Sequence, residues 1–296
     1  MTTKSFFKKH TASLAGKTVA ITGATGGLGR ALCRHLAALG ASLLLLDRNS
    51  QKSNALIDAL KAEFPALFAT HVCVDMADFA SVAAVTERLK SAPPDVLILN
   101  AGAYHIPRKT CDTGLDNVFQ INFASPYYMA RTLHPLMRER GGRIVAVGSI
   151  AHNYEKSDQA DEDFSTRKKP SHVYGNAKRH LMAALWGTCC AQGGVAVTHP
   201  GITFTGITAH YPKVIFALIK HPMKLIFMPP RRASLCILRG VFEDTAAGEW
   251  IGPRVLSIWG APAKKRLSTI SNEEQARICA TAERIYQDLQ AKGENT

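Results

Sequence analysis

Thr22-Gly23-Ala24-Thr25-Gly26-Gly27-Leu28-Gly29 is the stretch that decides the fold of this chain. A β-prone segment, residues 17–22, runs into it, and residues 30–39 after it have helical spacing that ends at Gly40. The glycines are therefore expected to form a strand-to-helix turn. At such a turn the missing Cβ atoms let the backbone approach phosphate oxygens, and the helix N-terminus offers free N–H groups. The stretch predicts a phosphate-binding turn.

The next predicted strand ends in a residue suited to a ribose. Residues 42–46 read Ser-Leu-Leu-Leu-Leu, and Asp47 follows at the distance expected for an acidic ribose-binding residue. The Asp47 carboxylate can accept hydrogen bonds from both ribose hydroxyls and would repel a 2′-phosphate. Arg48 instead suits a 2′-phosphate or stacks on adenine. The pair predicts a dinucleotide site and leaves the type of ribose open.

Predicted strands and helices alternate along the whole chain. The strands are expected at 17–22, 42–47, 67–74, 95–99, 142–148, 194–199 and 254–259. The helices are expected at 26–39, 50–63, 78–90, 171–192 and 231–246, with a long helical region from about Gly114 to Arg140. This alternation predicts an α/β fold, in which helices cover both faces of a doubly wound parallel sheet. Ligands of such sheets bind beyond the carboxyl ends of the strands, where the motif residues should converge.

Tyr174 and Lys178 lie four positions apart, and therefore on one face of the predicted helix 171–192. A free tyrosine has a pKa of about 10, which is too high for a base at neutral pH. A neighbouring ammonium group favours the phenolate. The pair is thus a candidate for exchanging a proton with a substrate oxygen.

These motifs together resemble the short-chain dehydrogenase/reductase family, from about Lys17 to Trp259. The glycine spacing is G-x-x-x-G-x-G, as in that family, and differs from the common G-x-G-x-x-G fingerprint. The matching segments, in chain order, are 22–29, Asp75-Met76, Leu99-Asn100-Ala101-Gly102, Asn122, Ser149, 174–178, and Pro200-Gly201 with Thr205. The long separation of Ser149 from Tyr174 is similar to that in the carbonyl-reductase and retinol-dehydrogenase branch.

The resemblance implies a Rossmann-like fold and a role for each matching residue. Tyr174 would be the general acid/base, and Lys178 would lower its pKa and hold the nicotinamide ribose. Ser149 would hydrogen-bond the reacting oxygen, and Asn122 would support a water relay, unless it only kinks its helix. The implied cofactor site consists of Thr22, Gly23, Thr25, Gly26, Gly27, Leu28, Gly29, Asp47, Arg48, Asp75, Met76, Asn100, Ala101, Gly102, Tyr174, Lys178, Pro200, Gly201 and Thr205.

The function that the resemblance implies is an NAD(P)-dependent oxidoreductase, which interconverts an alcohol and a ketone or aldehyde on a lipophilic small molecule. NAD is favoured over NADP, because the family's NAD enzymes carry Asp at the position of Asp47 and Gly26 is not basic. No metal is expected. The alternative is a catalytically idle NAD(P)-binding redox sensor or interaction protein, which the intact catalytic set argues against. A nucleotide-sugar epimerase is disfavoured by the glycine spacing.

Composition sets further limits on the class of protein. The chain has 296 residues, of which 46% are hydrophobic, enough for a large core. Its seven cysteines are scattered without a C-x-x-C pair, which suits reduced thiols and predicts a cytoplasmic protein. The net charge of +13 is spread along the chain, and this favours an anionic cofactor over nucleic acid. We expect no secretion signal and no membrane-spanning segment.

The predicted organisation is an N-terminal arm (1–16), a dinucleotide-binding and catalytic domain (17–260) and a C-terminal helical tail (261–296). Two segments interrupt the repeat of strands and helices. The polar residues 152–171 either roof the site or form a solvated loop. Residues 202–230 mix large apolar and basic side chains, and are expected to form a substrate lid or to contact an anionic membrane surface. Homo-oligomer formation stays open.

Overall fold

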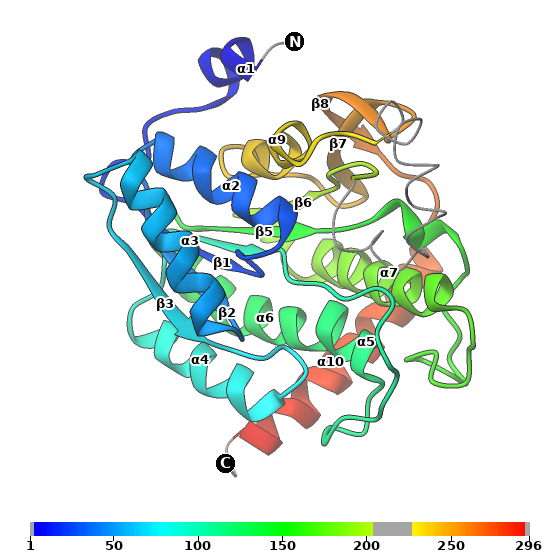
Figure 1. The fold of residues 1–296 in the computed structure, drawn as a ribbon. Coiled ribbons are helices and arrows are strands. Elements are labelled where there is room, and N and C mark those ends of the chain that lie inside the picture. Colours follow the sequence, from blue (N-terminus) through cyan, green and yellow to red (C-terminus); the bar gives the residue numbers. More distant parts are fainter. Residues whose placement is uncertain (1–2, 204–226, 294–296) are drawn as a thin grey trace, which may run out of the picture.

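The computed structural model describes residues 3–203 and 227–293, in which an eight-stranded sheet lies between two layers of helices (Figure 1). The strands are β1 (Thr18–Thr22), β2 (Ser42–Asp47), β3 (Ala69–Cys73), β4 (Val96–Leu99), β5 (Arg143–Val147), β6 (Val195–Thr198), β7 (Glu249–Val255) and β8 (Trp259–Arg266). The α-helices are α1 (Thr3–His10), α2 (Gly27–Ala38), α3 (Ser50–Glu63), α4 (Phe79–Ser91), α5 (Asn117–Phe119), α6 (Ser125–Glu139), α7 (Pro170–Thr188), α9 (Pro230–Gly240) and α10 (Asn272–Gly293). Short helices of other types are the π-helix η1 (Gln120–Ala124) and the 3-10 helices η2 (Ile150–Asn153) and η3 (Cys190–Gln192).

The sheet has the order β3-β2-β1-β4-β5-β6-β7-β8. All neighbouring strands are parallel except β7 and β8, which form an antiparallel pair at one edge. The predicted doubly wound, Rossmann-like parallel sheet is thus confirmed. Because β1 to β6 share a direction, their carboxyl ends meet at one edge, where Thr22, Asp47, Leu99, Val147 and Thr198 end their strands.

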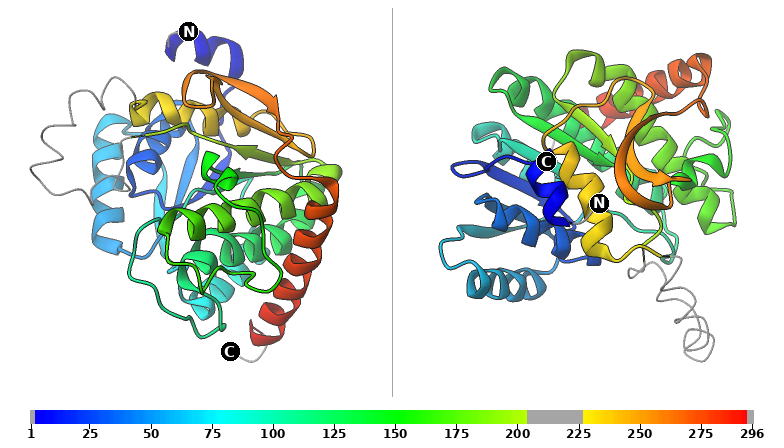
Figure 2. Two further views of the ribbon diagram at one scale, coloured as in Figure 1. Left: turned by 90° about the vertical axis from the view of Figure 1, so that its right-hand side faces the viewer. Right: turned by 90° about the horizontal axis from the view of Figure 1, so that it is seen from above.

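Each face of the sheet packs against its own layer of helices (Figures 1 and 2). On one face α2, α3 and α9 bury Leu32, Leu56 and Leu235 against the sheet. On the other face α4, α6, α7 and α10 form the larger apolar cluster, in which Leu181 and Ile285 are buried. The two layers explain why the inner strands are apolar on both sides, as β1 and β4 are.

The last predicted strand, 254–259, is wrong. These residues span the turn of a hairpin between β7 and β8, in which Leu256 and Ser257 have φ values of 47° and 59°. A turn with positive φ at two residues normally uses Asn or Gly, and Leu256-Ser257 carries neither, so no turn was expected there. Residues 261–266, expected in the tail, belong to β8 of the sheet. The final helix expected in that tail is α10.

Two other predicted helices differ in their limits. The region from Gly114 to Arg140 forms α5, η1 and α6 in succession, with a π-helical turn between the two α-helices. The helix expected at 231–246 ends as α9 at Gly240, where a Cβ would lie 2.7 Å from Thr198 Cγ2. Beyond it the chain turns back, and the Thr245 hydroxyl accepts a hydrogen bond from the Val197 amide at 3.0 Å.

The predicted arm, 1–16, contains helix α1, which lies beside α2 and α9 (Figure 2). Phe6 is buried in the core, the ring centroids of Phe7 and His35 are 5.3 Å apart, and His10 contacts Glu243 at 3.2 Å. Most of the predicted lid, including Thr205, lies outside the described residues. In the part of the chain that is described, no helix is long and apolar enough to cross a lipid bilayer.

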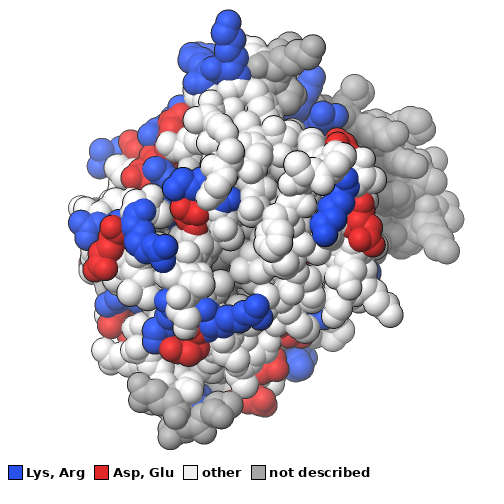
Figure 3. All heavy atoms as spheres, turned by 90° about the vertical axis from the view of Figure 1, so that its left-hand side faces the viewer, with Lys and Arg blue, Asp and Glu red and all other residues white. Residues whose placement is uncertain are grey.

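Charged side chains of both signs are mixed on the side of the molecule that carries β3 and α3 (Figure 3). Ion pairs at the surface of the molecule include Arg34 with Glu63 at 2.5 Å and Lys90 with Glu87 at 2.8 Å. This face therefore presents no continuous basic band of the kind that binds nucleic acid.

Candidate active site

The glycine turn between β1 and α2 is packed so closely that two of its positions exclude a side chain. Gly23 has a φ of +68°, and a Cβ there would lie 2.8 Å from Ala101 Cα. A Cβ on Gly29 would lie 2.3 Å from the Gly23 carbonyl oxygen. Glycine at 23 and 29 therefore lets the turn fold tightly against the end of β4.

Helix α2 begins without a side-chain cap, unlike the next two helices. The Asn49 side chain accepts a hydrogen bond from the Lys52 amide at the start of α3, and Asp78 does the same for the Ser81 amide at the start of α4. At α2 the N-cap is Gly26, which has no side chain to offer. The first N–H groups of α2 are thus left for an anion, with the partial positive charge of the helix end behind them.

Thr22 and Asn100 connect the ends of β1 and β4 beneath this turn. The Thr22 hydroxyl accepts hydrogen bonds from the Asn100 and Ala101 amides, both at 3.0 Å. The Asn100 side-chain amide donates to the carbonyl oxygens of Thr22 and Gly23, also at 3.0 Å. With their side chains used in this way, both residues shape the turn.

Asp47 lies at the end of β2 and is 7% exposed. Its Oδ1 accepts a hydrogen bond from the Thr25 hydroxyl at 3.2 Å, whereas Oδ2 is buried without a partner among the described residues. Burial raises the pKa of Asp47, although the hydrogen bond from Thr25 opposes this. Arg48 is exposed beside it and forms no ion pair with the described residues.

A cavity of about 440 Å³ extends from the glycine turn along the carboxyl edge of the sheet. Most of the predicted cofactor residues line it: Gly23, Thr25, Gly26, Gly27, Leu28, Gly29, Asp47, Arg48, Asp75, Met76, Asn100, Ala101 and Gly102. Seven lining residues were not predicted; Leu46, Val74 and Ile121 are three of them, and the other four form the run Ala103-Tyr104-His105-Ile106. Only the position of that run directly after Asn100-Ala101-Gly102 could have indicated it.

The cavity fits a dinucleotide in its chemistry. The uncapped helix end and the glycine turn suit a pyrophosphate, because backbone N–H groups are the donors available there. The unpaired Asp47 Oδ2 suits a ribose hydroxyl, since a buried carboxylate oxygen without a donor is costly. Across the described residues, no three His, Cys, Asp or Glu side chains are grouped to hold a metal ion.

Tyr174 and Ser149 meet beside the far end of the cavity. Ser149 follows β5 and caps η2, where its hydroxyl accepts a hydrogen bond from the Ala151 amide at 3.2 Å. Burial raises the pKa of Tyr174 to about 12, and a hydrogen bond with the Ser149 side chain lowers it in part. The Tyr174 ring also meets the ring of Tyr104 edge to face, with centroids 5.4 Å apart. Tyr104 lines the cavity, so it connects the two groups of residues.

Lys178 is almost fully buried one turn further along α7. Its Nζ donates to the Val147 carbonyl oxygen at 2.9 Å and lies 5.8 Å from the centroid of the Tyr174 ring. Burial lowers the pKa of Lys178 to about 8. Burial has the largest effect on the pKa of Tyr174, and the lowering expected from the Lys178 ammonium stays a prediction.

Asn122 lies in the π-helical turn η1 and has no exposed surface. Its side-chain amide donates to the carbonyl oxygens of Ala103 and Val118 at 2.7 and 2.8 Å, and its Oδ1 accepts from the Ala103 amide at 3.3 Å. A Cβ on Gly102 would lie 2.8 Å from Asn122 Oδ1 and 3.8 Å from Lys178 Nζ. Asn122 thus fixes the segment that runs from the cavity to Lys178.

Pro200 and Gly201 lie beyond the end of β6, outside the described cavity lining. Gly201 has a φ of +83°, and a Cβ there would lie 2.6 Å from the Ile258 carbonyl oxygen in the β7–β8 turn. The hairpin therefore fixes the path by which the chain leaves β6.

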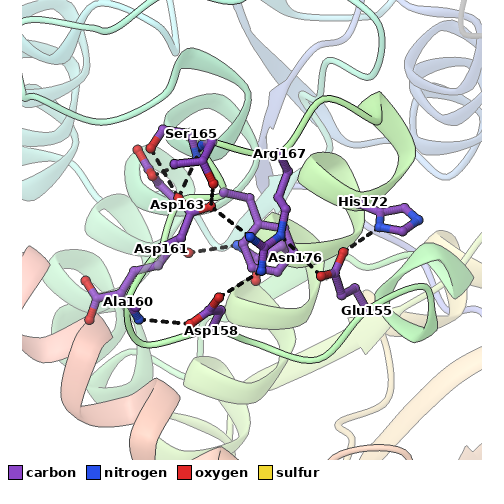
Figure 4. A network of polar contacts seen from close by, with 12 residues as sticks. Glu155, Asp158, Ala160, Asp161, Asp163, Ser165, Arg167, His172 and Asn176 are labelled. Carbon is purple, nitrogen blue, oxygen red and sulfur yellow. Dashed lines mark hydrogen bonds and ion pairs between the residues drawn. The ribbon is translucent and has the colours of Figure 1, made fainter.

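Residues 152–171 form a folded segment held by Arg167 (Figure 4). The Arg167 guanidinium donates to Glu155 at 3.2 Å and to Asp158 at 2.8 Å, and lies 3.6 Å from Asp161. His172 on α7 contacts Glu155 from the other side. Several carboxylates around one guanidinium fold this polar segment without an apolar core of its own.

The same segment reaches Tyr174 from the side. Phe164 is fully buried with a φ of 56°, and packs with Val118 and Val173 in a cluster that also touches Tyr174. Arg108 holds the Phe164 carbonyl oxygen at 2.9 Å. None of the residues 152–171 lines the described cavity, and Phe164 packs the segment against α7 beside Tyr174.

The sequence of this chain is similar to those of known proteins. The sequence model described as short chain dehydrogenase matches residues 17–160. Polyprenol dehydrogenase of Mus musculus is 28% identical over 254 residues, which are 81% of this chain and 75% of that protein. A Streptomyces antibioticus protein named "probable oxidoreductase" is 30% identical over 203 residues, which are 67% of this chain and 68% of that protein.

Solved structures agree on the fold. An uncharacterised protein from Mycobacterium paratuberculosis superposes with a TM-score of 0.71 at 22% identity, over 93% of this chain and 95% of the other. A short-chain dehydrogenase from Sphingobium yanoikuyae in complex with NADPH gives a TM-score of 0.58 at 23% identity, over 76% and 83% of the two chains. With its glycine turn, its sheet and these relatives, the chain belongs to the short-chain dehydrogenase family.

Proposed function

We propose that this protein is an NAD(P)-dependent oxidoreductase that interconverts an alcohol and a ketone or aldehyde on a lipophilic small molecule, with NAD as the favoured cofactor. One observation carries the proposal. Ser149, Tyr174 and Lys178 come together at the carboxyl edge of the sheet, beside the end of a cavity that begins at an uncapped helix and a glycine turn.

The residues that would hold the cofactor divide the cavity into two ends. The glycine turn and the first amides of α2 would bind the pyrophosphate, and Asp47 Oδ2 would accept a hydrogen bond from the adenine-side ribose. Lys178, with Asn122 behind it, would hold the nicotinamide ribose. When bound, NAD(P) supplies the hydride transfer.

Tyr174 would move the proton. In reduction its phenol donates a proton to the carbonyl oxygen of the substrate, and in oxidation its phenolate removes the proton of the alcohol. Ser149 Oγ would donate a hydrogen bond to the same oxygen and so fix its position. Since burial raises the pKa of Tyr174 to about 12, the phenol is protonated near neutral pH and is ready to act as the acid.

The substrate class rests on the side chains at the catalytic end. Tyr104, Ile106 and Ile121 line the cavity there, and they favour an apolar substrate over a sugar. The relative named polyprenol dehydrogenase points in the same direction. Contact of residues 202–230 with a membrane surface, the route by which such a substrate would arrive, stays a prediction.

A substrate screen tests the proposal. The purified protein is mixed with NADH or NADPH and a panel of ketones, aldehydes and long-chain enals, or with NAD or NADP and the matching alcohols, and reduced nicotinamide is followed by absorbance. We expect turnover of apolar compounds that is lost in Tyr174→Phe. Tight cofactor binding without turnover of any compound would instead favour the idle binding protein.

A further inference from the structure

A buried ion pair lies directly behind the proposed catalytic residues. Arg179 follows Lys178 on α7 and pairs with Glu274 of α10; their side chains are 2% and 5% exposed. Arg179 Nε lies 2.7 Å from Glu274 Oε1, and Nη2 lies 2.5 Å from Oε2. This bidentate geometry fixes the plane of the guanidinium.

The other donors of Arg179 bind two segments of the chain. Nη1 donates to the His152 carbonyl oxygen at 2.8 Å, and Nη2 donates to the Thr269 carbonyl oxygen at 2.7 Å. Glu274 is held in turn by the amide and hydroxyl of Ser157, at 3.0 and 2.8 Å. The ion pair therefore connects α7, α10 and the turn η2 that follows Ser149.

The His152 ring holds the other end of that turn. His152 Nδ1 lies 2.7 Å from the Ser149 carbonyl oxygen, and Nε2 lies 2.8 Å from the Thr269 hydroxyl. A carbonyl oxygen can only accept, so Nδ1 carries the proton and Nε2 accepts from Thr269. Burial lowers the pKa of His152 to about 4, so the ring is neutral at pH 7 and this tautomer is maintained. The His152 and Trp250 rings meet in a T-shaped arrangement, with centroids 5.5 Å apart.

We propose that His152 and Arg179 are positioning residues, which keep the Ser149 hydroxyl beside the Tyr174 hydroxyl. Glu274 in turn fixes the orientation of Arg179. The His152 ring holds the Ser149 carbonyl oxygen, and Arg179 holds the carbonyl oxygen of His152 itself. The inference rests on the proposed function, because it assumes that Ser149 contacts the reacting oxygen. It adds that the C-terminal helix, which is distant in sequence from the family motifs, sets the geometry of catalysis.

The central test is a double-mutant cycle between His152 and Ser149. His152→Phe keeps an aromatic ring against Trp250 but removes both hydrogen bonds. We expect kcat to fall by about 10- to 100-fold, as for a reacting group displaced by an ångström, with the Kd for NADH unchanged. In a Ser149→Ala background the same substitution should cost less than about twofold, because the group that it positions is already missing.

His134→Phe is the matched control for that substitution. His134 is also buried, at 3% exposure, and its Nε2 contacts the Gly193 carbonyl oxygen at 2.8 Å, away from the Ser149 turn. It should lower the midpoint of urea unfolding as His152→Phe does, while kcat stays within about twofold of the wild type. An equal loss of kcat in both variants would assign the effect to general destabilisation and overturn the proposal.

The ion pair is tested by removing both charges together. Arg179→Met alone leaves Glu274 buried and unpaired, and is expected to unfold easily. Arg179→Met with Glu274→Met avoids that penalty, so the unfolding midpoint should recover most of the loss. The turnover should stay low, because the His152 carbonyl oxygen is still released. Recovery of kcat together with stability would show that the pair is only structural.

The outcomes separate this inference from the proposed function. If Ser149→Ala leaves kcat unchanged, the role of Ser149 fails, and the positioning inference fails with it. If Ser149→Ala slows turnover but the His152 and paired Arg179 variants do not, only the positioning inference is wrong. Thr269→Val, which is nearly isosteric and frees His152 Nε2, gives the same test should His152→Phe not fold.

Discussion

At the glycine turn the start of α2 has no side-chain cap and Asp47 Oδ2 has no partner among the described residues, whereas behind Ser149 and Lys178 the polar groups are paired with one another. The first end shows the uncapped α2 and the unpaired Asp47 Oδ2. At the second end Lys178 donates a hydrogen bond to the Val147 carbonyl oxygen, and the His152 ring donates one to the Ser149 carbonyl oxygen. Unpaired groups suit an end that binds a ligand, and paired groups suit an end that must hold reacting atoms still.

The two ends also differ in how far apart in the sequence their contacting residues lie. Gly23, Gly29 and Asp47 belong to one strand-helix-strand unit, so a short motif predicts them. Arg179 and Glu274 are 95 positions apart, and Ser157 and Glu274 are 117 apart. The binding end can therefore be recognised in the sequence, whereas the support of the catalytic end is visible only in the fold.

The largest effect is expected at the catalytic end, from Tyr174→Phe. The phenol is the proposed proton donor, so turnover should fall by on the order of 10²-fold or more. The Kd for the cofactor, measured by fluorescence titration of NADH, should change little, because the binding end is untouched. Turnover close to that of the wild type would remove Tyr174 from the mechanism.

At the binding end the sharpest test is Gly29→Ala. The added Cβ would lie 2.3 Å from the Gly23 carbonyl oxygen, so the turn must open and cofactor binding should be lost. Overpacking of this kind costs about 1–3 kcal/mol in the free energy of unfolding. Gly26→Ala is the control for stability, since its Cβ meets the same oxygen at 3.4 Å, an ordinary contact. Equal unfolding midpoints for the two variants would contradict this account of the turn.

The next prediction concerns the cost of burying the charged Lys178 ammonium, which the pH dependence of the unfolding free energy measures. Its pKa is lowered by burial from 10.5 to about 8, so between these pH values the unfolded chain binds more protons than the folded one. The penalty is full below about pH 8 and fades as the pH rises toward 10.5. Relative to Lys178→Met, the wild type should gain about 2 kcal/mol of unfolding free energy between pH 7.5 and 9.5.

Urea unfolding of both proteins without cofactor at the two pH values measures this difference. A constant difference would mean that Lys178 is solvated in the folded protein. The same variant should also bind cofactor more weakly and turn over more slowly, because the ammonium is proposed to hold the nicotinamide ribose.

The smallest expected effect concerns the choice of cofactor at the binding end. Wild-type protein should favour NAD in kcat/KM, and Asp47→Ser should shift the ratio toward NADP by about tenfold, with Arg48 left to pair with the added phosphate. Steady-state kinetics with both cofactors gives the ratio. A strong NADP preference in the wild type would show that Arg48 dominates and that Asp47 Oδ2 does not meet the ribose.

The sequence predicted the strands β1 to β6 well, because all of them except β3 are mainly short apolar runs and each is followed by turn or loop residues. It missed β7, since Gly252 and Pro253 are typical of loops. In the fold Gly252 lies beside the Trp250 and His199 side chains, and β7 pairs with β6 at a single position, Ile251, which leaves Pro253 no parallel ladder to break.

For the site, the sequence indicated the residues but not their surroundings. It placed Tyr174, Lys178 and the glycine turn at one edge of the sheet, as the structure does. It could not predict that burial would raise the pKa of Tyr174, because burial depends on Tyr104, Phe164 and other residues from separate loops. Nor could it show that residues 152–171 fold around Arg167.

The separation of Arg179 from Glu274 has a consequence for synthesis of the chain. A ribosome adds about 5–20 residues per second, so Glu274 is made roughly 5–20 s after Arg179. During that interval Glu274 is not yet available to pair with Arg179. Burial of the unpaired guanidinium on α7 would therefore be unfavourable. The dinucleotide-binding half is synthesised before then, whereas the turn after Ser149 is expected to take its final form only when α10 has docked.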